Sequence, residues 1–165
     1  NFKSLIKLDL FKDSEHIIHS YSQVKNEIVE SDRHESNVRK VLNLGHTIGH
    51  AVESYSHISE KINDLKHGEA IVIGLITELY ISHKKLNFPM KDLMAIKYHL
   101  DKHFDLISFS DGDINQIYEL MIYDKKNSSN KINFVLLKGI GEPILDQSVN
   151  IDIFRESFLF YNNLL

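Results

Sequence analysis

Three histidines with close spacing in the sequence could bind a metal ion. Two of them, His46 and His50, lie four residues apart, and the third, His67, follows within the motif Lys66–Glu69. Residues four apart on a helix share one face, so His46 and His50 would point the same way. The chain contains no cysteine, and a metal site must therefore use His, Asp or Glu as ligands. A lone histidine is more often an ordinary core or surface residue, but this grouping favours a metal site.

Two glycines, Gly45 and Gly49, accompany the histidine pair. A glycine inside a helix costs about 1 kcal/mol relative to alanine, so two of them within one turn need a reason. The usual reason is that another backbone or a ligand approaches the helix closely. The glycines therefore predict a crowded helix face beside the histidines.

The spacing of His46 and His50 is similar to that of the helical zinc-protease motif, but that motif requires a glutamate directly after the first histidine as general base. Thr47 occupies this position, which excludes a protease of that type. A His-Asp doublet, typical of a class of metal-dependent phosphohydrolases, occurs nowhere in the chain. The histidines therefore indicate a metal site of another kind.

Polar side chains precede the histidines at helical spacing. Intervals of three or four residues separate Arg39, Asn43, His46 and His50. A single helix over Val38–Tyr55 would therefore present a guanidinium, an amide and two imidazoles on one face. An exposed helix face usually carries Lys and Glu instead. The stripe favours a polar, anionic, hydroxylated ligand beside a metal, and an ordinary exposed face is the alternative interpretation.

Apolar residues recur at helical spacing along most of the chain, which predicts a mainly α fold in a single domain. The expected helices are Ser14–Ser31, Val38–Tyr55, Gly68–Leu86, Pro89–Phe104, Asp111–Tyr123 and Asp152–Asn162. Asp111 is expected to cap the helix that it begins. Ile, Phe, Val and Leu then predict a small β-hairpin within Ile132–Leu145. Polar loops are expected at Ser56–Lys66 and Asn127–Asn130.

The composition fits an ordinary globular domain and excludes several classes of protein. The 165 residues carry a formal net charge of -4, which argues against nucleic acid as the main partner. The longest apolar run, Ala70–Ile76, is far shorter than the roughly 18–20 residues that span a bilayer, and Asn1–Asp9 lacks the long apolar run expected of a signal peptide. Gly139-Ile140-Gly141 lacks the third glycine of a dinucleotide-binding turn. We expect a cytoplasmic protein with neither a membrane nor a nucleic-acid partner.

Three blocks of the sequence resemble the signatures of 3-dehydroquinate synthases. The first and most specific comprises Lys25, Glu35 and the run Arg39–Glu53, which reads RKVLNLGHTIGHAVE. The second is HGEAIVIG at His67–Gly74, and the third is DKK at Asp124–Lys126 with the β-rich run after it. The blocks occur in the family's order and span most of the chain.

The resemblance implies a role for each candidate site residue. The implied metal ligands, with Zn²⁺ or Co²⁺ as the metal, are His46 and His67. The implied substrate-binding residues are Lys25, Arg39, Asn43, His50, Lys125 and Lys126. The implied catalytic residues are His50, Lys25 and Glu35, of which His50 would lie near the proton chemistry.

By the same resemblance, the enzyme converts 3-deoxy-arabino-heptulosonate 7-phosphate to 3-dehydroquinate and phosphate in the shikimate pathway, with NAD as a second cofactor. In the family, an NAD-binding domain and a glutamate that is the third metal ligand precede this region. Nothing before Lys25 resembles either of them. We therefore expect this chain to be the carboxyl-terminal helical domain of a longer enzyme, which is homodimeric as a whole and inactive as the isolated domain.

Three alternatives remain beside this interpretation. Another sugar-phosphate cyclase, with an inositol-like or valiolone-like product, resembles the sequence broadly, but such relatives tend to differ at the positions of Asn43 and His50. A helical domain with a structural role would bind metal without turnover. An iron-dependent polyol dehydrogenase would use metal-binding histidines but has no need for Lys25 and Arg39 to hold a phosphate.

Overall fold

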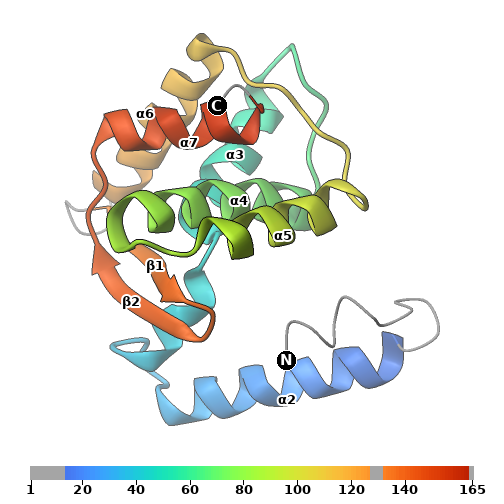
Figure 1. Ribbon diagram of the computed structural model, residues 1–165, viewed down its shortest axis with the longest axis vertical. Helices are drawn as coiled ribbons and strands as arrows, with labels where there is room; N and C mark the ends of the chain where they lie inside the picture. The colour runs from blue at the N-terminus through green and yellow to red at the C-terminus, as the bar shows by residue number, and fades with distance from the viewer. Residues whose placement is uncertain (1–13, 127–131, 164–165) are drawn as a thin grey trace. The chain divides into compact units, whose positions relative to one another are not determined.

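The computed structural model describes residues 14–126 and 132–163 of the chain (Figure 1). It confirms a mainly α fold with an antiparallel β-hairpin near the carboxyl end. In chain order the elements are α2 (Ser14–Ser31), the 3₁₀ helix η1 (Val38–Asn43), α3 (His46–Ile58), α4 (His67–Leu86), α5 (Met90–Asp101), α6 (Asp111–Lys126), β1 (Phe134–Gly139), β2 (Glu142–Gln147) and α7 (Ile151–Tyr161). The chain divides into two units, residues 1–42 and 43–165.

The first unit holds α2 and the turn that follows it. Helix α2 ends at Ser31, and the next residue, Asp32, organises the turn with its side chain. Its carboxylate oxygens accept hydrogen bonds from the backbone N–H groups of Ser36 at 3.1 Å, Asn37 at 2.7 Å and Arg39 at 3.1 Å. The bond from Asn37, together with the others, lowers the pKa of Asp32 to about 2. Asp32 therefore holds the backbone that leads into η1.

Helix α4 is the central element of the second unit. It packs against α3, α5, α7 and β1 (Figure 1). A helix surrounded in this way must be apolar nearly all round. Its buried apolar residues include Ile73, Ile76, Leu79 and Ile81. The predicted helix is confirmed, and it begins at His67, one residue earlier than expected.

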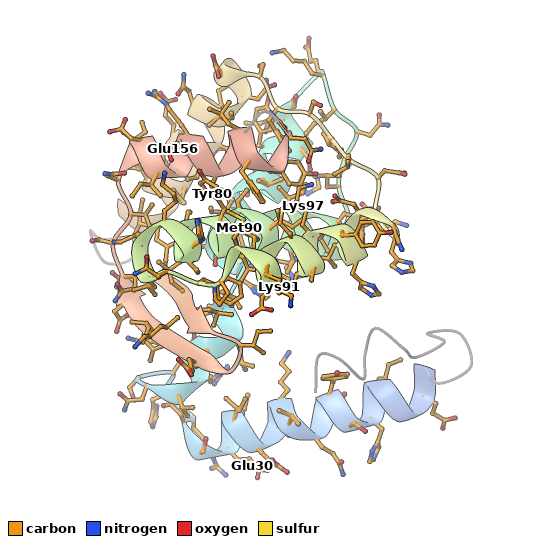
Figure 2. All side chains as sticks on the ribbon, viewed as in Figure 1. Glu30, Tyr80, Met90, Lys91, Lys97 and Glu156 are labelled. Carbon is orange, nitrogen blue, oxygen red and sulfur yellow. The ribbon has the colours of Figure 1, made fainter. Side chains whose placement is uncertain are left out.

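Aromatic and charged side chains join α4 to α7. Tyr80 of α4 stacks on Phe160 of α7, with ring centroids 4.7 Å apart. Tyr80 also donates a hydrogen bond to Glu156 of α7 at 3.4 Å (Figure 2). Lys84, one turn further along α4, pairs with the same carboxylate at 2.8 Å. These contacts hold the last helix along the central one.

The predicted hairpin is formed by β1 and β2, which pair antiparallel and turn at Ile140 and Gly141. Gly141 has a φ of +85°, a left-handed conformation that glycine adopts without strain. The residues Phe134–Leu136 of β1 are buried. The backbone N–H of Leu137 donates to Oγ of Ser82 in α4 at 3.0 Å. Strand β1 therefore closes one side of the core, and β2 is the more exposed strand.

The prediction of one continuous helix over Val38–Tyr55 is wrong in its first part, although its second part is helical. Residues 38–43 form the 3₁₀ helix η1, and α3 starts only at His46, after a break at Gly45. Gly45 has a φ of +80°, which lies outside the range of a right-handed helix. A spacing of three or four residues fits 3₁₀ and α turns alike, so the pattern did not reveal the break. The expected polar stripe that began at Arg39 is therefore divided between two elements.

Other element boundaries differ by a few residues from those expected. Helix α3 extends to Ile58 and so takes in the start of the expected loop at Ser56. Helix α5 ends at Asp101 rather than near Phe104. The expected turn at Asn127–Asn130 lies outside the described residues. Within residues 14–126 and 132–163, no helix is both long and apolar enough to span a bilayer.

Helix α6 is capped by Ser110 rather than by Asp111, which is its first residue. The Ser110 N–H donates to Oδ2 of Asp113 at 2.8 Å, and the Asp113 N–H lies 3.4 Å from Oγ of Ser110. This reciprocal pair is a capping box. The expected cap was therefore wrong by one position.

Candidate metal centre

Helix α3 starts at His46 because Gly45 and Glu78 fix its first turn. Glu78, which is fully buried on α4, accepts hydrogen bonds from the N–H of Gly45 at 2.6 Å and of Ile48 at 3.1 Å. The first N–H groups of a helix have no partner within it, so this carboxyl group caps α3 from the neighbouring helix. Burial raises the pKa of Glu78 to about 8, against the opposing effect of the backbone hydrogen bonds.

Glycines allow the backbones of α3 and α4 to approach each other closely. A Cβ on Gly74 of α4 would lie 2.0 Å from the carbonyl oxygen of Gly45 and 2.6 Å from the nitrogen of Gly49. A Cβ on Gly49 would in turn lie 3.2 Å from the carbonyl oxygen of Ala70. The close approach predicted from Gly45 and Gly49 is therefore confirmed, and the neighbouring backbone is that of α4.

His46, His50 and His67 gather at the starts of these two helices. One possible ligand atom of each lies within 4.8 Å of those of the other two. The ring centroids are 5.4 Å apart for His46 and His50, 5.7 Å for His46 and His67, and 5.5 Å for His50 and His67. Since two of the rings stand on α3 and the third on α4, the contact between the helices sets their separation.

This spacing is close to what a shared metal ion requires. Two nitrogens that bind the same zinc ion lie at most about 4.2 Å apart, because each bond is about 2.0–2.1 Å long. Side-chain movements of less than about 1 Å would therefore bring the imidazoles onto one ion. Imidazole nitrogen suits Zn²⁺ and several other transition-metal ions.

The imidazoles of His46 and His67 are each held by a hydrogen bond at Nδ1. Nδ1 of His46 lies 3.2 Å from the carbonyl oxygen of Leu44. Nδ1 of His67 lies 3.0 Å from Oε2 of Glu53, and this bond lowers the pKa of Glu53 below its usual value. Histidines that bind a metal through one nitrogen usually donate the other N–H to a carboxylate or a carbonyl group. The donor set therefore fits a metal ion.

The cluster brings together residues to which the sequence assigned different roles. His46 and His67 are the predicted metal ligands. His50, one turn further along α3, is predicted to bind the substrate and to be catalytic. Asn43, the predicted substrate ligand, is the last residue of η1. All four belong to the second unit.

The charged candidates from the first signature belong to the first unit. Lys25 is exposed on α2. Glu35 has a φ of +52°, and its carboxylate lies 3.8 Å from Nε of Arg39. A left-handed backbone at a residue other than glycine is uncommon and concentrates at functional sites. The side chains of Lys125 and Lys126, in the last turn of α6, lie outside the described residues.

Two acidic residues beside the histidines had no predicted role. Glu53 stood inside the first signature, and its position three residues after His50 indicates a shared helix face. Glu78 lies in an apolar stretch of α4, and a glutamate is almost never fully buried without partners. The apolar residues around Glu78 in the sequence could therefore have indicated a buried glutamate with hydrogen-bond partners.

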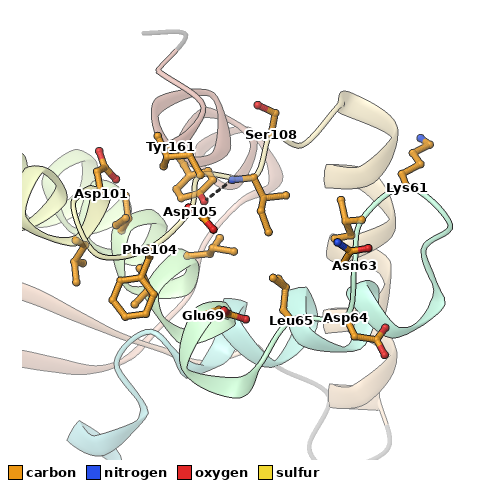
Figure 3. Close-up of a pocket in the computed structure, with 17 residues that line it drawn as sticks. Lys61, Asn63, Asp64, Leu65, Glu69, Asp101, Phe104, Asp105, Ser108 and Tyr161 are labelled. Carbon is orange, nitrogen blue, oxygen red and sulfur yellow. Dashed lines mark hydrogen bonds between the residues drawn. The ribbon is translucent and has the colours of Figure 1, made fainter.

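A pocket of about 560 Å³ opens elsewhere in the second unit, among the loop before α4, α4 itself and the segment that follows α5 (Figure 3). None of the predicted site residues lines it. Four of its lining residues are acidic, namely Asp64, Glu69, Asp101 and Asp105, and one, Lys61, is basic. These carboxylates would repel a phosphorylated substrate. The histidine cluster is therefore the better candidate site for such a ligand.

Comparison with known proteins places these features in a family. The profile of the 3-dehydroquinate synthase C-terminal family matches residues 2–127. The chain is 44% identical over 142 residues to the 3-dehydroquinate synthase of Parabacteroides distasonis, which covers 82% of this chain and 40% of that protein. It is 38% identical over 130 residues to the 3-dehydroquinate synthase of Oceanobacillus iheyensis, which covers 77% of this chain and 35% of that protein. The chain thus spans well under half the length of these relatives.

Two solved structures have a similar fold. A 2-deoxy-scyllo-inosose synthase complexed with carbaglucose-6-phosphate, NAD⁺ and Co²⁺ matches with a TM-score of 0.70 and 27% identity, over 89% of this chain and 41% of that chain. A 2-epi-5-epi-valiolone synthase from Streptomyces hygroscopicus with NAD⁺ and Zn²⁺ bound matches with a TM-score of 0.71, over 91% of this chain and 40% of that chain. At 17% identity, the second match shows a likeness of fold alone.

Proposed function

Since this chain belongs to the 3-dehydroquinate synthase family, we propose that it is the metal- and substrate-binding domain of an enzyme that converts 3-deoxy-arabino-heptulosonate 7-phosphate to 3-dehydroquinate and phosphate. Such an enzyme is a phosphate-eliminating lyase of the shikimate pathway. The observation that carries the proposal is the gathering of His46, His50 and His67 where α3 meets α4. All three lie inside the segment that matches the family.

His46 and His67 are the proposed metal ligands, and Zn²⁺ or Co²⁺ is the proposed metal. When bound, such an ion acidifies a coordinated hydroxyl group and polarises a carbonyl oxygen. Both histidines have Nδ1 beside an oxygen acceptor, which leaves Nε2 for the metal. Catalytic zinc sites usually have three protein ligands. We propose that the third ligand is a glutamate from a region of the enzyme that corresponds to the part of the relatives outside the match with this chain.

The side chains proposed to bind the substrate suit its phosphate, carboxylate and hydroxyl groups. Lys25 and Arg39 would make charge-assisted hydrogen bonds to the anionic groups. The amide of Asn43 can both donate to and accept from hydroxyl groups. His50, one turn from His46, would exchange a proton with a substrate oxygen. The remaining candidates are Glu35 as a catalytic residue and Lys125 and Lys126 as substrate ligands.

NAD is proposed to bind outside this chain. The sequence contains no glycine-rich dinucleotide-binding turn, and the chain spans 40% of the Parabacteroides relative. The 165 residues alone should therefore not turn over the substrate, even with NAD and metal supplied. We further propose that the whole enzyme is a cytoplasmic homodimer.

A chimeric enzyme tests this proposal. The matching segment of the Parabacteroides protein would be replaced by this chain, and phosphate release from 3-deoxy-arabino-heptulosonate 7-phosphate would be measured with NAD and Co²⁺. We expect turnover that His46→Ala or His67→Ala abolishes, and a raised KM for Arg39→Ala. A folded chimera that binds NAD and Co²⁺ but releases no phosphate would contradict the proposed reaction.

The same assay separates the reaction from that of another sugar-phosphate cyclase. The likeness to a 2-deoxy-scyllo-inosose synthase that binds carbaglucose-6-phosphate favours this class as the alternative. Release of phosphate from a hexose 6-phosphate, without turnover of the heptulosonate, would support the alternative.

A further inference from the structure

Glu53 connects the two helices that carry the histidine cluster. It stands on α3, three residues after His50, and its Oε2 lies 3.0 Å from Nδ1 of His67, the first residue of α4. Residues three apart share a helix face, so Glu53 projects toward the cluster from the same side as His50. One helix thus supplies two histidines and the carboxylate that contacts the third.

The partners of the two Nδ1 atoms determine where the imidazole protons lie. An ionised carboxylate and a backbone carbonyl group can only accept hydrogen bonds. Nδ1 of His67 must therefore donate to Glu53, and Nδ1 of His46 must donate to Leu44. In the neutral rings the lone pair then lies on Nε2. Both histidines are in the same tautomer, with Nε2 as the nitrogen that can bind a cation.

We propose that Glu53 is a positioning residue that fixes the tautomer and the ring orientation of His67, so that Nε2 of this histidine faces the metal. The proposal rests on the proposed metal role of His67. Glu53 acts through the imidazole and does not itself bind the ion. A carboxylate at Nδ1 also makes the imidazole a more basic ligand, because it stabilises the positive charge that metal binding induces on the ring.

His67 depends on such a partner more than His46 does. His46 is held by a carbonyl group of its own turn, and its neighbour Gly45 is packed against the backbone of α4. The side chain of His67 is 54% exposed, and a Cβ on its neighbour Gly68 would meet no atom within 4 Å. The side chain of His46 is half-buried, whereas that of His67 is exposed, so the hydrogen bond to Glu53 is the more important restraint on His67. Loss of this bond should therefore affect His67 first.

The tautomer of His67 can be measured without a metal. The chain would be labelled with ¹⁵N-histidine, and long-range ¹H–¹⁵N NMR correlations recorded near pH 8, where most histidines are neutral. We expect His67 to carry its proton on Nδ1. Glu53→Gln should preserve this state, because the amide oxygen can accept the same bond, whereas Glu53→Ala should give a mixture of tautomers. Glu119→Ala, at an exposed glutamate of α6, is the matched control and should change nothing.

A titration with Co²⁺, followed by visible absorption, gives the second readout. We expect the affinity to fall by roughly 10–100-fold in Glu53→Ala, the usual effect of removing a residue that orients a metal ligand. The fall should be smaller in Glu53→Gln and absent in Glu119→Ala. Circular dichroism would establish that each variant folds.

Two results would overturn the role of Glu53. One is a wild-type His67 with mixed tautomers, and the other is a Glu53→Ala variant whose tautomer and Co²⁺ affinity match those of the wild type. The proposed metal role fails in a different way. A wild-type chain with the expected tautomer that binds no Co²⁺, alone or in the chimera, would contradict that role and reduce Glu53 to a structural contact.

Discussion

Replacing Gly74 by alanine should force α3 away from α4 and disturb the histidine cluster. The added Cβ would lie 2.0 Å from the carbonyl oxygen of Gly45 and 2.6 Å from the nitrogen of Gly49, whereas ordinary contacts begin at 3.4 Å. Both atoms belong to the backbone at the start of α3, so neither can rotate away. Restoring an ordinary contact with the oxygen requires a movement of about 1.4 Å, the difference between 3.4 and 2.0 Å.

The expected loss of stability follows from this clash. Extra methyl groups in a packed core cost about 1–3 kcal/mol and occasionally more, and a clash with two backbone atoms belongs at the upper end of this range. The better helix propensity of alanine offsets at most about 1 kcal/mol. We therefore expect Gly74→Ala to lower the free energy of unfolding by about 2 kcal/mol or more. For a domain of this size, that corresponds to a Tm lower by roughly 4–8 °C.

Thermal unfolding followed by circular dichroism measures this loss, and Gly68→Ala is the control. Gly68 lies in the same helix, but a Cβ there would meet no atom within 4 Å, so its Tm should stay the same or rise slightly. Gly74→Ala should also weaken Co²⁺ binding relative to the wild type. If Gly74→Ala is as stable as Gly68→Ala and binds Co²⁺ like the wild type, the close approach of the two helices does not exist in solution.

Three further experiments test other parts of the second unit. Because burial raises the pKa of Glu78 to about 8 from 4.5, the folded state holds an extra proton between these values. Urea unfolding should therefore show wild-type stability falling as pH rises through this window, and Glu78→Gln should abolish the fall. Burial alone would raise the pKa of Asp113, but its hydrogen bonds, first among them that from Tyr55, hold it well below 3.8. The stability that this carboxylate contributes is present above pH 3.8 and lost as pH falls below it, so Asp113→Asn should be less stable near pH 7 and converge with the wild type in acid. His46→Ala should abolish the visible absorption of bound Co²⁺, whereas His57→Ala, near the far end of α3, should retain it.

Much of the fold could be predicted because helical periodicity is a local signal. The predicted bounds of one helix, Ser14–Ser31, are those of α2. The hairpin was predicted from a β-rich run beside glycines, which is also local. The grouping of the three histidines followed from a four-residue spacing and from the position of His67 at the start of a helix. Neighbours in sequence carried enough information for each of these features.

The break before α3 could not be predicted because its cause is not local. The N–H of Gly45 donates to Glu78, 33 residues further along the chain. In the sequence alone, the three- and four-residue spacing runs without interruption from the residues of η1 into those of α3. The spacing therefore gives no sign of the break, which depends on the distant Glu78. The same reason explains why Glu53 went unassigned, since its partner His67 lies on the next helix. The sequence thus predicted that the three histidines lie close together, but it did not predict the contacts that orient them.

The contact between α3 and α4 forms part of the core of the second unit, and it also determines the distances among the histidines. Its effect on metal binding can be separated from a general loss of stability. Leu136→Ala, at a buried position of β1 that belongs to neither helix, should cost about 2–5 kcal/mol, yet the molecules that remain folded should bind Co²⁺ with wild-type affinity. Gly74→Ala should lower stability and intrinsic affinity together, because it moves the first turn of α3, and with it His46, relative to His67. If Co²⁺ binds only the folded state, it should raise the free energy of unfolding of the wild type by about 2.7 kcal/mol at a metal concentration 100 times the Kd. An affinity loss in Leu136→Ala as large as that in Gly74→Ala would show that the cluster depends on the whole domain rather than on this contact.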